Sequence, residues 1–485
     1  MLTVVGFTAR AEAMTPHASH TAGPAGPAAT RLTQSAVAVL ASGLVGVGWL
    51  AVPQIPAPAA AFLIAAAPVG AWVLFRAPLA LVVGFVVFSL FRIHEVILPL
   101  KPLRIPLMLS LGALAGLGLA IATGRLKPFL TAELKLLLAF AALVTLQIAF
   151  AANPGLALTY WIDSYSKIVL MAFAIAWMVA SPAQLKQILR VMTLIGAGIA
   201  GVAIFNALKG VGMVEGTRVT INRAEGSALG DPNDLAMVLL FPIGFAVSMI
   251  LARSSAVWER VVGGLALPVL IWGLLATQSR GGLLGVMAVV GVFAWNRVRN
   301  KALLVSGGGV AGAGLFVAAG IGERSVVQEG GGVGEIDASA EGRLHAWEAA
   351  VNMALSNPLT GVGVDNFVEN FYYYTPQWGG MAKAVHSTWF QVMGEAGFLG
   401  FVLFVSLVAA TALSSVAAWR RLGGLRDPEA DRLRDAMEAV IATLAGFCIS
   451  GTFLTQAFTW PFYILLAFLV AGRRMAEGLF AGAPR

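Results

Sequence analysis

The sequence predicts an all-α protein that is integral to a membrane, built as a polytopic helical bundle with about 12–14 transmembrane helices and one large outer loop containing amphipathic helices. Hydrophobic residues make up 58% of the chain and charged residues only 12%, about half of the roughly 25% found in soluble domains. Mean hydropathy is +0.83. This much apolar surface cannot be hidden in one globular core, so lipid must surround most of it.

The chain divides into four predicted parts. Residues 1–34 contain the Gly/Pro/Ala-rich stretch TAGPAGPAAT and no apolar core followed by a cleavage site, so we expect a disordered cytoplasmic tail. Residues 35–321 are expected to form an N-terminal transmembrane bundle, 322–397 an outer loop that forms a lid and carries catalytic residues, and 398–485 the C-terminal transmembrane helices with a cytoplasmic tail.

Apolar runs long enough to be membrane helices recur along the chain, and twelve is the alternative to a count of fourteen. The candidate spans lie near 35–52, 58–75, 78–91, 106–123, 134–151, 167–180, 187–208, 233–252, 259–277, 281–297, 302–321, 398–418, 437–454 and 457–472.

The basic residues orient this map. With the N-terminus inside, 21 of the 32 Lys and Arg residues fall in cytoplasmic segments and 11 in outer ones, as the positive-inside rule requires. The long polar interval 322–397 is then extracytoplasmic. No charged residue falls in the middle of a predicted span, which argues against a proton-coupled transporter and favours chemistry at one membrane face.

The interval 322–397 holds two of the five histidines and nine of the 24 carboxylates. Within it, SAEGRLHAWEAAVNMALSNP has apolar residues at helical spacing and stops at Asn357-Pro358. We expect an amphipathic helix resting on the membrane surface. Arg343 borders its apolar face, and the alternative for Arg343 is an ordinary surface charge.

Arg280 lies in SRGGLLG, inside a run of 39 residues, 259–297, that is too long for one ordinary span. Arg280 and the two following glycines are predicted to split the run by a tight turn on the outer face. Glycine at 281 allows backbone to approach a ligand, with Ser279 beside it, and the guanidinium could bind phosphate bidentately. The alternative is an interfacial arginine that snorkels to lipid headgroups.

His386 directly precedes another predicted helix, with Ser387 as its N-cap. A helix N-terminus favours the neutral imidazole, which suits a general base near pH 7. Asp231-Pro232 is a helix-start signature. Arg218 and Arg223, in the same outer segment as Asp231, could add positive potential. The alternatives are a plain loop histidine and solvated loop charges.

Nothing in the sequence predicts a metal site or a cofactor. HExxH, DxD and paired histidines at i, i+4 are absent, and Cys448 is the single cysteine. The net charge of +8 is spread over short loops, which fits membrane topology and excludes nucleic acid as a partner.

Four segments together resemble the O-antigen ligase and polymerase family of bacterial inner-membrane proteins. They are DPNDLA, SRGGLLG, EGRLHAWEAAVNMALSNPLTGVGVDNF and HSTWFQVMGEAGFLGFVLF, within about 215–405. One departure is Ser387, where the family more often has Asn after the histidine.

The resemblance implies a metal-independent, inverting glycosyltransferase that moves a glycan from undecaprenyl diphosphate to lipid A–core oligosaccharide at the periplasmic face. Arg280 and Arg343 match the arginines implicated in diphosphate contact, and His386 matches the proposed base. Five further residues are assigned to substrate binding: Arg218, Arg223, Asp231, Ser279 and Gly281.

The expected setting is the bacterial inner membrane. The protein would be a multi-pass monomer whose active site faces the periplasm, and its partners would be the lipid-linked donor, a lipid A–core or other glycolipid acceptor, and membrane lipids. The alternative is a sister polymerase that joins repeat units, and a flippase or exporter without chemistry is a third, less favoured interpretation.

Overall fold

The structure is a computed structural model that describes residues 78–318, 338–378 and 380–482. The predicted tail and the spans near 35–52 and 58–75 lie outside these residues. The chain divides into two units, 1–76 and 77–485, and the fold described here is that of the second.

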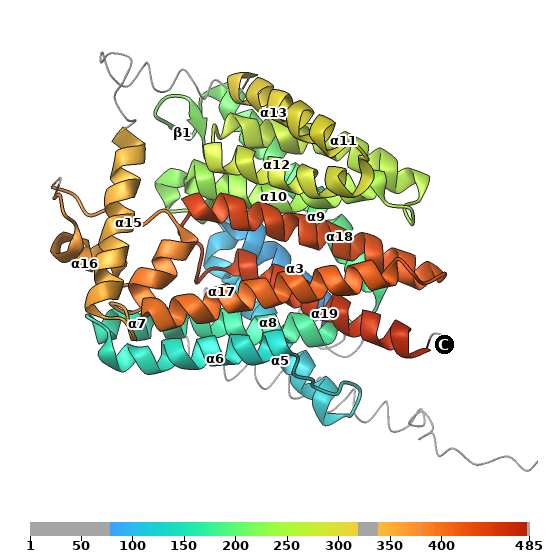
Figure 1. Cartoon of the computed structure of the whole chain (residues 1–485), viewed down its shortest axis with the longest axis horizontal. Coiled ribbons are helices and arrows are strands. Elements are labelled where there is room, and N and C mark those ends of the chain that lie inside the picture. Colours follow the sequence, from blue (N-terminus) through green and yellow to red (C-terminus); the bar gives the residue numbers. More distant parts are fainter. Residues whose placement is uncertain (1–77, 319–337, 379, 483–485) are drawn as a thin grey trace, which may run out of the picture. The chain divides into compact units, whose positions relative to one another are not determined.

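The second unit is a bundle of helices (Figure 1). Its strands, within the described ranges, are β1 (Met213–Val214) and β2 (Arg218–Val219), paired antiparallel in a short hairpin. Its longer helices are α3 (Pro78–Phe91), α5 (Ile105–Ala122), α6 (Ala132–Gln147), α8 (Ser166–Met178), α9 (Pro182–Lys209), α10 (Pro232–Leu251), α11 (Val257–Ala276), α12 (Arg280–Arg297), α13 (Lys301–Ala318), α17 (Thr388–Leu422), α18 (Pro428–Ser450) and α19 (Trp460–Gly482).

Seven described helices are both long and apolar enough to cross a membrane. These include α10, which is almost wholly buried and packs against α9, α11, α12 and α18. The prediction of a polytopic helical bundle is therefore confirmed, whereas the count of 12–14 spans stays a prediction.

α17 and α18 begin earlier than the apolar runs because each has a polar first part that hydropathy does not detect.

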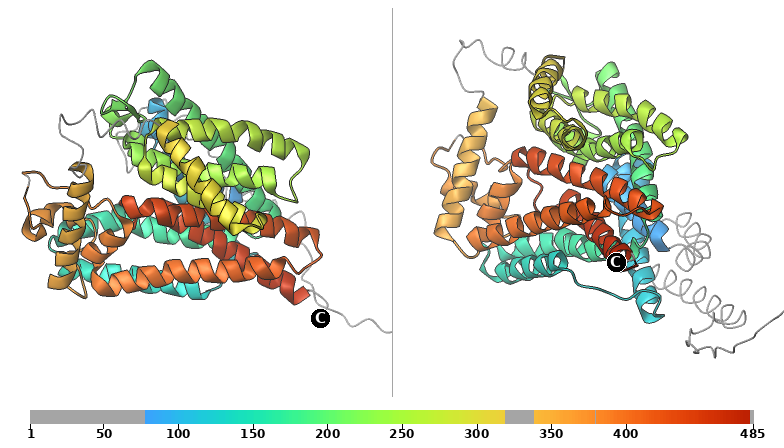
Figure 2. Two further views of the ribbon diagram at one scale, coloured as in Figure 1. Left: turned by 45° about the horizontal axis from the view of Figure 1, so that its top comes forward. Right: turned by 45° about the vertical axis from the view of Figure 1, so that its right-hand side comes forward.

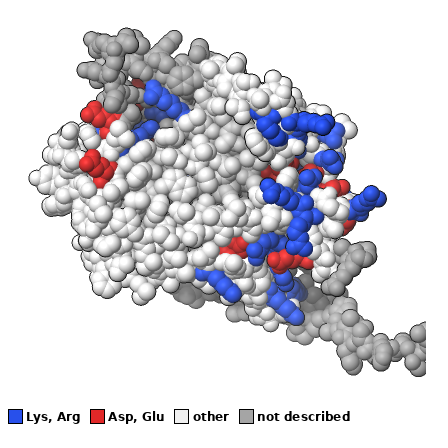
Figure 3. Space-filling view, viewed as in Figure 1, with Lys and Arg blue, Asp and Glu red and all other residues white. Residues whose placement is uncertain are grey.

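Charged side chains gather at the two ends of the helices, with a broad uncharged zone between them on the face shown in Figure 3. The larger group lies at the end that carries the C-terminus. Here α12 ends at Arg297, which pairs with Glu438 of α18 at 2.7 Å, and Arg473 pairs with the buried Glu133 at 2.9 Å. In each pair one partner, Arg297 or Glu133, stands at a helix end, as expected where helices leave an apolar layer.

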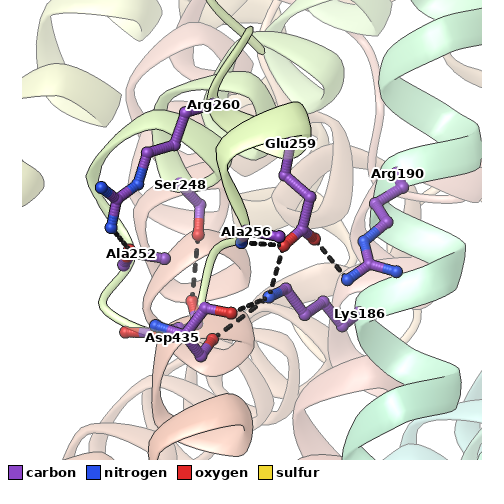
Figure 4. Close-up of polar contacts among 9 residues, drawn as sticks. Lys186, Arg190, Ser248, Ala252, Ala256, Glu259, Arg260 and Asp435 are labelled. Carbon is purple, nitrogen blue, oxygen red and sulfur yellow. Dashed lines mark hydrogen bonds and ion pairs between the residues drawn. The ribbon is translucent and has the colours of Figure 1, made fainter. Parts of the chain in front are cut away.

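A polar cluster that includes the carboxylates Glu259 and Asp435 joins three helices (Figure 4). Glu259, at the start of α11, is 1% exposed and pairs with Lys186 and Arg190 of α9. Asp435 of α18 accepts the main-chain N–H of Ser254 at 2.9 Å, and Ser254 in turn accepts from Lys186. The cluster fixes α9, α11 and α18 relative to one another.

Helices α15 (Ala338–Ser356) and α16 (Phe367–Tyr374) lie across the opposite end of the bundle (Figure 2). The helix predicted before Asn357 is confirmed, and part of its apolar side packs against protein, while Leu344 and Leu355 are exposed and its place on a membrane surface stays a prediction. Ala346, Ala350 and Met353 are fully buried in a small second core with residues of α16 and α17. The sequence pattern shows an apolar face, but not whether protein or lipid covers it.

α17 contains a break at Gly397, whose φ of +67° is outside the helical region. The break frees the carbonyls of Gly394 and Glu395, and these accept the N–H groups of Val362 at 2.9 Å and Gly363 at 3.0 Å. The segment after α15 is therefore a turn, as predicted from GVGVDN, and it ties the α15–α16 layer to α17.

Candidate active site

The turn between α11 and α12 forms as the sequence predicts. α11 ends at Ala276 and α12 begins at Arg280, with Ser279 as N-cap accepting the N–H of Gly282 at 3.1 Å. A Cβ at Gly282 would lie only 2.6 Å from the Cβ of Ala236, so glycine is what lets the start of α12 pack against α10. Arg280 is half-buried at the first position of the new helix.

Arg218 supports this turn from β2. Arg218 is 7% exposed. Its guanidinium donates to the carbonyl of Thr277 at 3.2 Å and to Oδ1 of Asn233 at 2.8 Å. Ser279 donates to the same Asn233 oxygen at 2.9 Å. Arg218 and Ser279, both assigned to substrate binding from the sequence, are thus brought together, and the structure shows Arg218 positioning the turn that carries Arg280.

Asp231 is the N-cap of α10, as predicted, and its Oδ1 accepts the N–H groups of Asn233 at 2.7 Å and Asp234 at 3.3 Å. Arg223 lies farther out. Its side chain is exposed and donates to the carbonyl of Gly230 at 2.9 Å. Arg223 therefore braces the segment that leads into α10.

His386 directly precedes α17, whose predicted N-cap is also confirmed, with Ser387 accepting the N–H of Phe390 at 3.5 Å. The backbone of His386 is left-handed, with φ at +45°, which is uncommon for a residue other than glycine. Its N–H donates to Oγ1 of Thr455 at 3.0 Å. The half-buried imidazole is therefore held by a main-chain anchor.

Two charged groups from other elements act on the imidazole of His386. Burial lowers the pKa of His386 below its usual value, the positive charge of Arg343 lowers it further, and the negative charge of Asp231 acts in the opposite direction. Arg343 from α15 and Asp231 from α10 therefore both lie within electrostatic range of His386. The net effect favours neutral imidazole near pH 7, the form that can accept a proton.

α15 holds Arg343 in this position through Trp347, one turn along the helix. The indole N–H of Trp347 donates to the carbonyl of Val385 at 3.1 Å, next to His386 in the chain. The same indole stacks on Phe390 of α17 with ring centroids 5.0 Å apart. The chain on either side of His386 is thereby fastened to the helix that carries Arg343.

One short segment, residues 451–456, contacts the N-terminal ends of three helices. It comprises η6 (Gly451–Phe453) and the three residues after it. Phe453 lies against Gly281 of α12, Leu454 accepts from Thr388 of α17 at 2.8 Å, Thr455 accepts from His386, and Gln456 donates to Asp234 of α10 at 2.7 Å. We call this arrangement the helix junction.

The helix junction is suited to an anion. Each helix N-terminus carries a partial positive charge of roughly half an elementary unit. Arg280 begins one of the three helices, and Arg343 acts electrostatically on the residue before another. The three N-termini and the guanidinium of Arg280 therefore add positive potential at the helix junction, and Arg343 adds a positive charge that acts on His386, whereas Asp231 acts on His386 in the opposite direction.

Sequence reasoning missed three residues of this arrangement. Asn233 links Arg218 to Ser279, and its only sequence signal was its place in the DPND segment. Thr455 and Gln456 gave no signal, since each acts through a partner far away in the chain. In the part of the chain that the structure describes, no group of three or more His, Cys, Asp or Glu residues could hold a metal ion.

Comparison with known proteins found one family. Residues 265–405 match the family model described as O-antigen ligase. The match begins within α11 and ends within α17, so it includes Arg280, Arg343 and His386. Arg218, Asp231 and the 451–456 segment lie outside it. No curated protein matched the chain.

Proposed function

We propose that this chain, whose residues 265–405 match the O-antigen ligase family model, transfers a glycan from undecaprenyl diphosphate to lipid A–core oligosaccharide. The transfer would be metal-independent, would invert the anomeric centre and would occur at the periplasmic face of the inner membrane. The observation that carries this proposal is that α15, the helix of Arg343, is bonded through Trp347 to Val385 next to His386, and that the charge of Arg343 acts on His386.

The diphosphate is the leaving group, and its negative charge grows as the glycosidic bond breaks. Arg280, Arg343 and the N-termini of α10, α12 and α17 are fixed positive groups of the kind that stabilises such charge. Because these groups are already oriented by the helix junction, little reorganisation is needed as the reaction proceeds.

His386 acts as the general base. A hydroxyl of the acceptor attacks the anomeric carbon, the bond from oxygen to that carbon forms, and the bond from carbon to the phosphate oxygen breaks. The hydroxyl proton passes to the imidazole, and the electron pair of the broken bond leaves with the diphosphate. Direct attack inverts the configuration. The nearby positive charge of Arg343 then favours loss of the proton from His386.

Helix directions support the orientation of the site. α12 runs from Arg280 at the helix junction to Arg297, and α17 runs from Thr388 to the basic pair Arg420 and Arg421. The helix junction and the end richer in basic residues are therefore at opposite ends of two helices. The positive-inside rule assigns the basic end to the cytoplasm, which supports a periplasmic site.

The test is reconstitution. Purified protein in lipid nanodiscs is mixed with lipid-linked glycan and lipid A–core, with and without a chelator. We expect glycan on lipid A–core, an inverted linkage by NMR, and an equal rate with chelator. Formation of glycan polymer in the absence of lipid A–core would show that the protein acts as the sister polymerase and not as a ligase. A retained linkage or chelator sensitivity would overturn the mechanism.

A further inference from the structure

A cavity of about 310 Å³ borders the helix junction. Thr455, which anchors His386, is among its lining residues, and so is Asp234, one turn beyond Asp231. Its walls come from α3, α10, the segment before α19, and the short helices α7 (Pro154–Tyr160) and η3 (Trp161–Tyr165). None of the residues assigned to the diphosphate lines the cavity, but Asp234, Thr455 and Gln456 of the helix junction do.

The polar side chains that line this cavity are held in place by other protein groups. Gln456 donates to Asp234 at 2.7 Å, and the hydroxyl of Tyr160 donates to the carbonyl of Phe458 at 3.1 Å. Thr459 donates to the side-chain oxygen of Gln456. These bonds fix the orientation of each group, and the phenol oxygen and carboxylate retain further capacity to accept hydrogen bonds.

Arg92 adds a donor at one side of the cavity. Its backbone is left-handed with φ at +50°, and one end of its guanidinium pairs with Glu95 at 2.5 Å. Its Nε is buried and has no hydrogen-bond partner among the described residues. Glu95 also accepts the N–H of Ala228 at 2.9 Å, which joins Arg92, through Glu95, to another residue of the cavity lining. A strained residue with an unused buried donor is an arrangement that often marks a binding site.

We propose that this cavity binds a sugar ring of the donor glycan, next to the diphosphate. The inference rests on the proposed function, and it names a subsite that the family match does not assign. Hydroxyl, amide, carboxylate and guanidinium groups can bond sugar hydroxyls, while the rings of Tyr160 and Trp460 offer apolar surface to the carbon face of a pyranose. The volume lies at the low end of the roughly 300–1,000 Å³ of small-molecule sites.

The test compares two carriers, undecaprenyl diphosphate without sugar and the glycan-bearing carrier isolated from membranes that make it. Binding is titrated to full-length protein in nanodiscs. Ala228→Trp narrows the cavity from an exposed position, and Ala224→Trp places the same side chain at an exposed position of the same loop that does not line the cavity. We expect Ala228→Trp to lower the affinity for the glycan-bearing carrier by about tenfold or more. Sugar-free carrier should bind Ala228→Trp as it binds wild type, and Ala224→Trp should change neither affinity.

If wild type and Ala228→Trp bind the glycan-bearing carrier with the same affinity, and likewise the sugar-free carrier, the sugar subsite is wrong. That result would not contradict the diphosphate site. Wild type that binds neither carrier would overturn the proposed function, and this inference with it. Tyr160→Phe serves as a second variant if Ala228→Trp does not fold. It keeps the ring and removes one hydroxyl, so the glycan-bearing carrier should bind several-fold more weakly, on the order expected for one hydrogen bond. Unchanged binding of that carrier would then contradict the subsite.

Discussion

The main-chain N–H of His386 donates to Oγ1 of Thr455 at 3.0 Å, joining residues 69 positions apart. This bond attaches the residue before α17 to the 451–456 segment. Other residues of that segment contact α10 and α12. His386 is thereby fixed relative to Asp231 and Arg280 without use of its imidazole. The side chain remains available for proton transfer.

Replacing His386 by Ala should reduce glycan transfer by about 10²–10⁴-fold, the usual contribution of a general base. The protein should still fold, because the bond to Thr455 uses the main chain. The measurement is the initial transfer rate in nanodiscs, alongside the thermal unfolding midpoint. His345→Ala, the matched control on α15, should change the rate less than twofold, a small effect on the scale of a catalytic base. Equal rates for wild type and His386→Ala would remove the base assignment.

The pH dependence of transfer should shift in opposite directions when the two charges near His386 are removed. The base is active when neutral, so activity falls as pH drops through the pKa of His386, which burial and Arg343 hold below its usual value. Arg343→Gln removes a positive charge, raises this pKa and moves the acid limb to higher pH. Asp231→Asn keeps a capping side chain, lowers the pKa and moves the limb to lower pH. Normalised pH–rate profiles of the three proteins provide the check, and limbs that coincide would contradict the electrostatic account.

Gly397→Ala should destabilise the protein by about 1–3 kcal/mol, because alanine at φ of +67° is strained and its Cβ would lie 2.6 Å from the carbonyl oxygen of Pro358. Gly478→Ala is the control. Position 478 is helical and open, so alanine there should be neutral or stabilising by up to about 1 kcal/mol. Thermal unfolding in detergent compares the two variants, and equal midpoints would show that the break in α17 is not required.

Asn233→Ala should slow transfer and lower stability, because its side-chain oxygen accepts from both Arg218 and Ser279. Leaving buried donors unpaired costs about 1–3 kcal/mol. Asn233→Asp keeps an acceptor oxygen and should recover much of the rate. Asn206→Ala, which removes a single bond to the carbonyl of Thr220, is the control for general loss of stability. If the Asp and Ala variants at 233 are equally slow, acceptance by this oxygen is not what positions the turn.

Local signals predicted much of the candidate site. The split of the run 259–297 at Arg280 and the caps Asp231 and Ser387 depend on neighbouring residues, and all formed as predicted. Two features could not be predicted. Part of the apolar side of α15 is covered by protein, and amphipathic spacing is the same for a lipid-facing helix. The 451–456 segment acts through partners far away in the chain, which no local pattern encodes.

The most direct test of the helix junction as a diphosphate site is the affinity for undecaprenyl diphosphate in nanodiscs. Arg280→Gln and Arg343→Gln should each weaken binding by about tenfold or more, equivalent to about 1.4 kcal/mol. Arg421→Gln, at the far end of α17, should bind as wild type does. Unchanged affinity in both Arg280→Gln and Arg343→Gln would contradict the central claim that these two guanidinium groups act on one diphosphate beside His386.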